Sequence, residues 1–284
     1  MDTKLVYVGA NGNTIDLFRN DYFIVTNVDG LTGVSSSVSA STNPNMDGDK
    51  VTNIQTQPRG IVFDLHIRHG VDVETAKRYI LRTIKPKQKG TLRMTQGERN
   101  LQIEGIVESI AMPRFSDSVM MQISFYCSQP YWKDIENVVV ELSRAIDLHY
   151  FPLDMGGLAL PAEGVPLGAY DINMTQTYTN DGDADCGVTI TIIALGEVIN
   201  PTIYKADGSY IGINDTMAAG DEIVINTERG YKSITKNGAN ILSKIKGGST
   251  FLQLETGDNQ FTIDSDDDTE NNVYFVLSFK RRFV

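Results

Sequence analysis

Short runs of alternating hydrophobic and polar residues, separated by glycine and asparagine turns, dominate the chain. The clearest run is residues 60–68, where Ile61, Phe63, Leu65 and Ile67 alternate with smaller or polar neighbours. A period of two is typical of a strand with one buried face. Similar runs predict further strands in the first half, at residues 5–8, 15–17, 22–28, 91–94, 101–110 and 119–127. The pattern therefore predicts a mainly β protein.

One segment has the spacing of a helix instead. Its apolar residues fall three and four positions apart and would form a single stripe: Val73, Ala76, Ile80 and Ile84. Asp72 can accept a hydrogen bond from the free amides at the helix start. Pro86 cannot continue a helix. We predict one helix over residues 72–85.

The second half contains strand-like runs and no helical pattern of useful length. The runs are at residues 188–195, 202–205, 222–226, 232–235, 251–254, 259–263 and 273–279. Short strands at regular spacing are typical of a β-sandwich of jelly-roll type. Residues 141–169 are irregular and rich in proline and glycine, so we expect a junction there. The predicted domains are residues 1–140 and 170–284, with a linker at 141–169.

Charge is divided unevenly between the halves. Residues 1–140 hold 15 basic and 15 acidic side chains, whereas residues 141–284 hold 10 basic and 21 acidic ones, which accounts for the net charge of −11. Such a split favours two domains with different surroundings. An acidic half would repel phosphate, so we expect no nucleic-acid binding by the C-terminal domain.

Neither a disulfide framework nor a membrane segment is expected. Cys127 and Cys186 lie far apart in the sequence, and a reducing compartment is the natural reading. No window approaches the roughly 18–20 apolar residues of a membrane span. The first ten residues lack the apolar core of a signal peptide.

Candidate residues for catalysis or metal binding are scarce. The histidines are His66, His69 and His149, and the first two would face opposite sides of a strand end. Two acidic turns, at Asp181, Asp183, Asp185 and at Asp264, Asp266, Asp268, lack the glycine and glutamate of a helix–loop–helix calcium site. We therefore predict no catalytic residues, no metal site and no cofactor.

Two segments are candidates for contact with other proteins. Residues 68–93 hold eight basic and two acidic side chains, among them Lys77, Arg78 and Arg82. They form either a solvated helix face or an electrostatic contact with an acidic neighbour. Residues 33–60 are polar and predict a long hairpin or loop, with Val34, Val38 and Met46 available for apolar contact.

Several short sequence motifs, taken in order along the chain, resemble those of the distal tail protein family of siphoviruses and related prophages. In the first half these are Asp29-Gly30 before a long loop and Cys127 to Trp132, with the sequence Cys-Ser-Gln-Pro-Tyr-Trp. In the second half they are Asn180 to Asp183, Asn200 to Ile203, Gly220-Asp221 and the basic, aromatic ending Phe279 to Phe283. The resemblance spans essentially the whole chain. Asn226 departs from it, because the family favours an acid there.

The resemblance implies a fold, a place and partners. The first domain would be a split β-barrel with one helix that forms a hexameric ring, and the second a galectin-like β-sandwich. The protein would be a structural component of the virion tail or baseplate hub, assembled in the cytoplasm of the bacterial host. Its expected partners are the tail tube (major tail) protein, the tape-measure protein and the tail tip or hub protein. A receptor-binding protein is a further candidate.

Two alternatives remain open. The C-terminal sandwich could belong to a carbohydrate-binding adhesin or receptor-binding module, because sugars stack on exposed aromatic rings. The single tryptophan, Trp132, falls outside the sandwich, which leaves Tyr204, Tyr210 and Tyr231. A cell-wall hydrolase would instead need two carboxylates about 5–10 Å apart in a cleft.

Overall fold

The chain folds into two compact units. Unit 1 consists of residues 1–135 and 282–284, and unit 2 consists of residues 136–281. The computed structural model describes residues 3–42, 47–112, 120–141, 143–147, 168–172, 175–267, 269 and 272–284.

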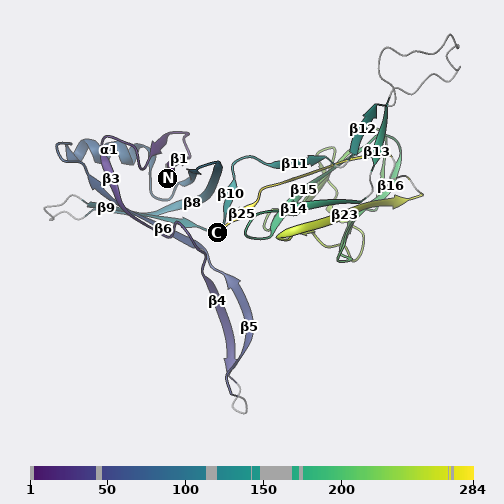
Figure 1. Cartoon of the computed structure of the whole chain (residues 1–284), viewed down its shortest axis with the longest axis horizontal. Helices are drawn as coiled ribbons and strands as arrows, with labels where there is room; N and C mark the ends of the chain where they lie inside the picture. The colour runs from purple at the N-terminus through teal and green to yellow at the C-terminus, as the bar shows by residue number, and fades with distance from the viewer. Residues whose placement is uncertain are drawn as a thin grey trace, which may run out of the picture. The chain divides into compact units, whose positions relative to one another are not determined.

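Unit 1 is built on one antiparallel sheet (Figure 1). Its strand order is β2-β1-β7-β8-β9-β6-β3, and β10 joins β8 and β25 at one side. In the described part of the chain the end strands β2 and β3 do not pair with each other, so the sheet is open and not a closed barrel. The strands are β1 (Thr3–Gly9), β2 (Thr14–Asp16), β3 (Phe23–Asp29), β6 (Arg59–Ile67), β7 (Lys89–Gln96), β8 (Arg99–Ala111), β9 (Met120–Cys127), β10 (Trp132–Asp134) and β25 (Arg282–Phe283).

A glycine pair makes room for the aromatic core of unit 1. Gly90 of β7 lies directly opposite Gly105 of β8. A Cβ at Gly90 would collide with the ring of Tyr7, and a Cβ at Gly105 would lie 2.6 Å from the Phe125 ring. The two rings meet edge to face with centroids 5.7 Å apart. The absence of side chains at the two glycines therefore lets two large rings fill the centre of the sheet.

The single helix of the described chain, α1 (Val73–Thr83), forms where the sequence predicts it. The side chain of Asp72 accepts hydrogen bonds from the backbone N–H and the hydroxyl of Thr75, at 2.9 and 2.8 Å. These two bonds hold the pKa of the Asp72 carboxyl below its usual value. Ala76 and Ile80 are buried against the core. The helix ends two residues earlier than predicted, at Thr83.

Unit 2 is a sandwich of two antiparallel sheets around one core. The first sheet has the order β11-β24-β15-β19-β20-β21, with β22 beside β15, and the second has the order β14-β23-β16-β17, with β18 beside β16. Apolar side chains of both sheets share the core, for example Ile190, Leu277 and Phe261. The strands of the first sheet are β11 (Val138–Glu141), β15 (Cys186–Ala194), β19 (Glu222–Asn226), β20 (Ser233–Lys236), β21 (Ala239–Asn240), β22 (Gln253–Leu254) and β24 (Val273–Phe279). Those of the second are β14 (Thr175–Asn180), β16 (Val198–Lys205), β17 (Tyr210–Gly212), β18 (Thr216–Met217) and β23 (Gly257–Asp266), and a short 3-10 turn η1 covers Leu242–Lys244.

Strands begin, lie within and end around the junction that the sequence predicts at residues 141–169. β11 joins the first sheet of unit 2, and β12 (Ser143–Asp147) pairs with β13 (Gly168–Ile172). Residues 148–167 lie outside the described part of the chain. The sequences of these strands, VVVE, SRAID and GAYDI, lack the clear alternation of apolar and polar residues that predicts a strand.

Candidate functional site: an exposed hairpin and a basic helix

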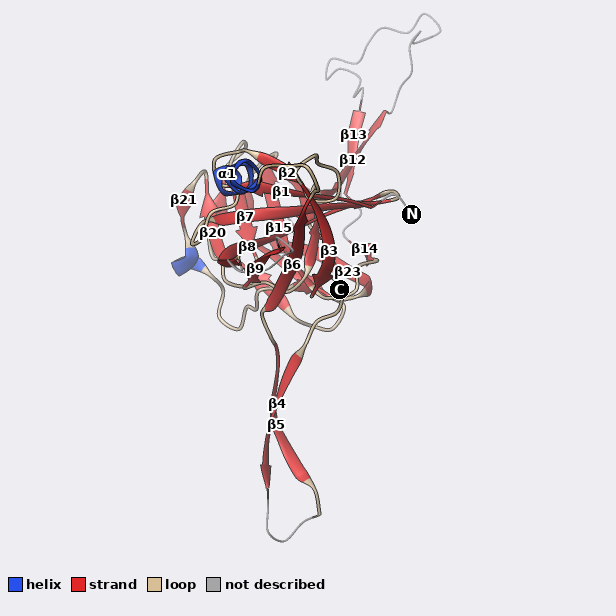
Figure 2. Ribbon diagram, turned by 90° about the vertical axis from the view of Figure 1, so that its left-hand side faces the viewer, coloured by secondary structure: helices blue, strands red, loops and turns tan. Residues whose placement is uncertain are grey.

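The predicted polar hairpin forms, and it stands away from the sheet of unit 1 (Figure 2). Its strands are β4 (Ser36–Thr42) and β5 (Asp49–Thr56), which pair only with each other. Every residue of both strands is exposed. An isolated two-stranded hairpin is marginally stable in water. A hairpin of this length with both faces exposed is therefore suited to contact another chain.

One face of the hairpin is apolar. Val38 lies opposite Ile54, and Ala40 lies opposite Val51. Val38, Ile54 and Val51 are 57%, 66% and 53% exposed. The other face is polar and carries Ser37, Ser39, Ser41, Lys50, Asn53 and Gln55. Apolar side chains left in water on one side of a strand pair are the usual mark of a binding surface.

A β-bulge creates this apolar face. Val51 and Ile54 are three residues apart, so strict alternation would place them on opposite faces. The register shifts between Ser39 and Ala40, which leaves Thr52 without an opposite residue. The Thr52 hydroxyl donates to the carbonyl of Ser39 at 2.9 Å. The extra residue turns Val51 to the same side as Ile54. The sequence prediction therefore included Val38 and missed Val51 and Ile54.

The base of the hairpin is fixed to the body of unit 1 through one carbonyl. The Leu31 oxygen accepts from the Arg59 guanidinium at 2.9 Å and from the Trp132 indole N–H at 3.0 Å. Arg59 is 5% exposed, and this burial lowers the pKa of its guanidinium. A Cβ at Gly30, which has a φ of 76°, would collide with the carbonyl of Gly60. These contacts fix the direction in which the chain leaves the sheet.

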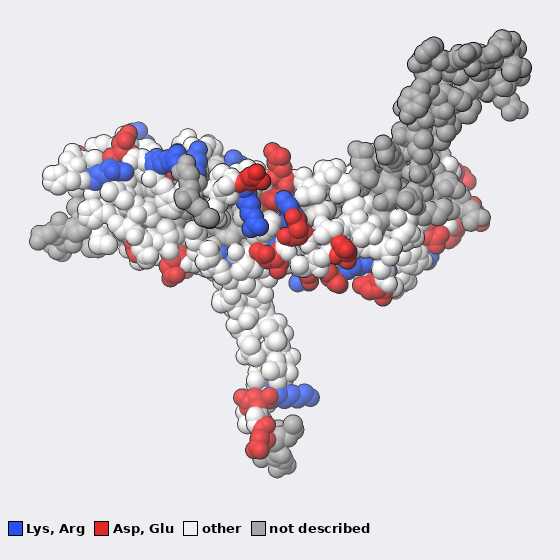
Figure 3. Space-filling model, in the orientation of Figure 1, with Lys and Arg blue, Asp and Glu red and all other residues white. Residues whose placement is uncertain are grey.

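The basic segment forms an exposed surface on α1 and the turn after it (Figure 3). Arg78 and Arg82 are four residues apart on the helix, so they share a face, and both are exposed. Lys77 is half-buried and lies 3.5 Å from Glu74, within the helix. Arg78 and Arg82 are therefore better placed than Lys77 to meet another molecule.

The other predicted contact residues are on or near the hairpin. Val34 precedes β4 and is 37% exposed, and Val38 lies on the apolar face. Met46 falls outside the described residues. The two strands of the hairpin carry charged side chains only near its tip, at Asp49 and Lys50, and Asp47 lies just before β5 (Figure 3).

The residues considered for catalysis or metal binding are scattered. Among the residues that the structure describes, no group of three or more His, Cys, Asp or Glu side chains could hold a metal ion. His66 lies on the outer face of β6, and His69 lies in the exposed turn after it. His149 and Asp268 lie outside the described chain. The remaining acidic turns carry structural contacts, such as Asp181 with Arg281 at 2.9 Å.

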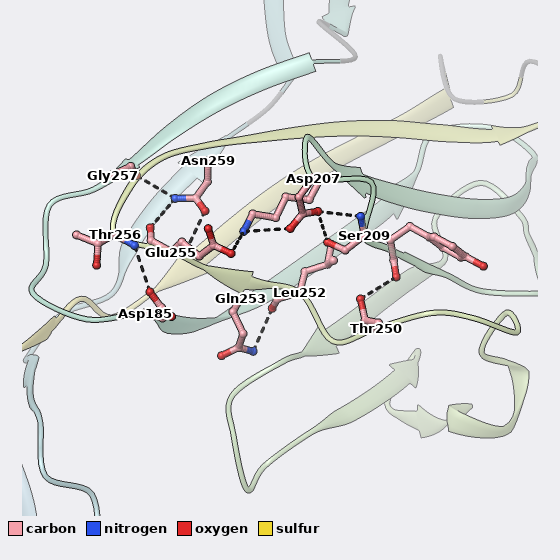
Figure 4. A network of polar contacts seen from close by, with 12 residues as sticks. Asp185, Asp207, Ser209, Thr250, Leu252, Gln253, Glu255, Thr256, Gly257 and Asn259 are labelled. Carbon is pink, nitrogen blue, oxygen red and sulfur yellow. Dashed lines mark hydrogen bonds and ion pairs between the residues drawn. The ribbon is translucent and has the colours of Figure 1, made fainter. Parts of the chain in front are cut away.

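Polar side chains of unit 2 hold its own turns together (Figure 4). Asn259 is 1% exposed, accepts from the Glu255 backbone N–H and donates to the Glu255 and Gly257 carbonyls. The Lys205 ammonium lies 3.0 Å from Glu255 and 3.8 Å from Asp207. These groups already have partners in their own chain, so this network does not form a ligand site.

The tyrosines considered for sugar binding do not form a flat platform. The rings of Tyr204 and Tyr210 are 5.6 Å apart and tilted by 40°. The Tyr210 hydroxyl donates to the carbonyl of Gly247 at 2.6 Å. Tyr231 is exposed at a separate position, and Trp132 is buried. No specific contact in the described chain favours the carbohydrate-binding alternative.

Within the described residues, no helix is both long enough and apolar enough to cross a membrane. Both cysteines are buried, and they do not form a disulfide with each other. Burial raises the pKa of the Cys127 thiol to about 12, so this thiol carries almost no thiolate at neutral pH.

Two protein-family models match the chain. A phage tail protein RIFT-related domain matches residues 10–127, and the C-terminal domain of the siphovirus-type tail component matches residues 181–283. The two matches together span more than three quarters of the 284 residues. They define the protein as a structural component of a phage tail. No curated protein sequence matched the chain.

Solved structures of phage proteins are similar to this chain. The crystal structure of the Dit (gp 19.1) protein of phage SPP1, described as a paradigm of the hub adsorption apparatus in phages that infect Gram-positive bacteria, aligns with a TM-score of 0.70 at 14% identity over 100% of both chains. A chain of the phage P2 baseplate, in its activated conformation with calcium, aligns with a TM-score of 0.49 at 13% identity over 100% of both chains. At this identity the SPP1 likeness shows the fold.

The chain belongs to the siphovirus distal tail protein family. This confirms the predicted family, the mainly β fold class, the structural and non-enzymatic role and the place in the virion tail.

Three residues from the sequence motifs that resemble the family lie at structurally defined positions. Trp132 fixes the hairpin base through its bond to Leu31. The side chain of Asn180 is buried, accepts from the Gly182 N–H and donates to the Leu254 carbonyl. Asn200 has a φ of 52° at an irregularity in β16. At Trp132 and Asn180 a single side chain therefore fixes the local backbone.

Proposed function

We propose that this distal tail protein forms a closed hexameric ring at the end of a tail tube, and that the β4–β5 hairpin makes the main contact between neighbouring copies. The main observation in support is the exposed apolar face formed by Val38, Val51 and Ile54. Among the described residues, the two strands of this hairpin pair with each other and with no third strand. Closed rings need head-to-tail contacts, in which one surface meets a different surface on the next copy. A projecting hairpin supplies one such surface.

The basic helix has a secondary role in this proposal. Arg78, Arg82 and the neighbouring lysines would meet acidic or polar groups of the next subunit. Exposed ion pairs contribute only about 0–1 kcal/mol each. The basic surface would therefore orient the copies, whereas the hairpin would supply most of the stability through apolar burial.

The ring would join the tail tube protein above it to the tail tip or hub protein below it, with the tape-measure protein as a further contact. This order of partners, and the number six, follow from the resemblance to the distal tail proteins. The sandwich of unit 2 could then remain available for a receptor-binding protein.

Removal of the hairpin tests the proposal. Ser36 and Thr56 are paired, so an Asn-Gly turn can replace residues 37–55 without moving the sheet. We expect this variant to stay folded and to be monomeric by light scattering under conditions in which the intact chain forms rings. A variant with Lys77, Arg78 and Arg82 reversed to glutamate should form weaker rings. An intact hexamer without the hairpin would contradict the proposal.

A further inference from the structure

A row of side chains crosses the outer face of the unit 1 sheet on four neighbouring strands. Lys89 of β7 lies opposite Ile106 of β8, Ile106 opposite Tyr126 of β9, and Tyr126 opposite Gly60 of β6. All four alternate with buried residues of their strands, so they face away from the core. Ile106 and Tyr126 are 39% and 41% exposed. We call these four residues the acceptor row.

The two ends of the acceptor row differ in chemistry. At one end Gly60 has no side chain, and a Cβ there would meet no heavy atom within 4 Å, which leaves open space beside Tyr126. At the other end the Lys87 backbone N–H donates to the Val107 carbonyl at 2.9 Å. This bond fixes an exposed basic turn next to Lys89. The row is therefore apolar in its middle and basic at one end.

The hairpin presents a complementary order from its base to its tip. The apolar pair Val38 and Ile54 comes first and Val51 follows, then Asp49, which accepts from the Thr42 hydroxyl at 2.9 Å. Thr42 lies opposite Asp49, and the Val38 and Thr42 positions are about 13 Å apart along the strand. On the acceptor row, the corresponding distance from Tyr126 to Lys89 is about 10 Å, across two strand spacings. The difference is smaller than the reach of a lysine side chain.

We infer that the hairpin of one copy lies across the acceptor row of the next copy, with its apolar face on Tyr126 and Ile106 and with Asp49 at Lys89. This inference rests on the proposed ring and adds the surface that receives the hairpin. Glu104 and Glu108 lie next to Ile106 along β8, so an acidic tip avoids repulsion only at the lysine end. The order of charge sets the direction of the hairpin on the sheet.

A second copy is the occupant that fits both surfaces. In one copy the hairpin stands away from its own sheet, and both of its faces remain in water. The apolar face and the acceptor row are different surfaces of the same chain, which is the arrangement that a head-to-tail contact requires. Repetition of this contact leads from one copy to the next around a ring.

Cysteine pairs test the contact in the full-length protein. We expect Val51→Cys combined with Ile106→Cys to give a ladder of disulfide-linked oligomers after mild oxidation, because its cysteines would come within bonding reach between copies. The matched control combines Val51→Cys with Ile24→Cys, since Ile24 is 46% exposed on the edge strand β3. The first variant should cross-link at least about tenfold more than the control. The native cysteines are buried and should contribute little.

Charge exchange tests the direction of the hairpin. Asp49→Lys and Lys89→Asp should each weaken assembly about fivefold, and the two together should restore it to within about twofold. Lys4→Asp, on the exposed position of β1, should give no such rescue with Asp49→Lys. Failure of the Lys89 pair to rescue would overturn the placement of Asp49.

The outcomes separate this inference from the proposed ring. Rings that form in light scattering but cross-link through Ile24 as well as through Ile106 overturn the acceptor row and leave the ring in place. A wild-type chain that stays monomeric at every concentration overturns the ring, and the acceptor row with it. Cross-links selective for Ile106 support both.

Discussion

The hairpin of unit 1 and the turns of unit 2 are both rich in polar residues, yet they use them in opposite ways. In unit 2, Asn180, Asn259 and Thr227 are buried and bind backbone groups of their own chain. On the hairpin, Asn53 and Gln55 belong to a strand that is exposed along its whole length. Most buried polar groups in proteins are paired, whereas exposed ones can form hydrogen bonds with water.

The comparison separates residues that fold the chain from residues that are free to meet another chain. In a polar turn whose side chains bind backbone groups, the hydrogen bonds are satisfied within the chain. A polar hairpin with one apolar face instead leaves apolar side chains exposed to water, and burial against another chain would remove them from water. Polarity in the sequence does not distinguish the two cases, but burial and strand register do.

The largest expected difference is between two asparagines. Asn259→Ala would leave three backbone groups of a buried turn without their partner, which should lower the free energy of unfolding by about 3 kcal/mol. Asn53→Ala, on the polar face of the hairpin, should change it by less than about 0.5 kcal/mol. Thermal or urea unfolding of the two variants measures both values. Equal effects would remove the distinction between the two regions.

A pair of fragments tests whether unit 2 folds without unit 1. The sequence predicts a separate domain over residues 170–284, but β11, which precedes this range, pairs with β24, and Val138 and Val140 pack on the core. We expect residues 136–281 to melt cooperatively, and residues 170–281 to be less stable by about 2 kcal/mol because those two valines are lost. Circular dichroism during heating reports both transitions. A longer fragment without a cooperative melt would show that unit 2 depends on unit 1.

The smallest effect is expected at two buried tyrosines. The hydroxyls of Tyr7 in unit 1 and Tyr178 in unit 2 have no hydrogen-bond partner in the described structure, and burial raises the pKa of both phenols. Tyr7→Phe and Tyr178→Phe should each be neutral or stabilise by up to about 1 kcal/mol, because an unpaired buried hydroxyl is removed. Differential scanning calorimetry should show the same sign in both units. A clear loss of stability would mean that the hydroxyl has a partner.

Much of the fold could be predicted from local sequence. The alternation at Ile61 to Ile67 and the cap at Asp72 determine a strand and a helix through neighbouring residues alone. The short strands β10 and β25 could not be found this way. They contain three and two residues and are defined only by pairing across about 150 positions.

The candidate site was half predictable for a related reason. Val38 and the basic helix residues follow from pattern and charge, since both are local properties. Val51 and Ile54 look out of phase with each other until the bulge at Thr52 is known. The acceptor row joins residues of four strands, so it depends on a strand order that local sequence does not encode.

Because β25 follows unit 2 in the sequence, unit 1 can be completed only after unit 2 has been synthesised. The chain leaves unit 1 after Ile135 and returns at Arg282, whose strand pairs with β10. Arg282 and Phe283 are buried there, and the Arg99 guanidinium lies 5.4 Å from the Phe283 ring. Because a ribosome makes β25 only after all of unit 2, the sheet that carries the hairpin stays unfinished until then. A nascent chain interrupted within unit 2 would therefore lack the strand that pairs with β10 and would hold an incomplete unit 1.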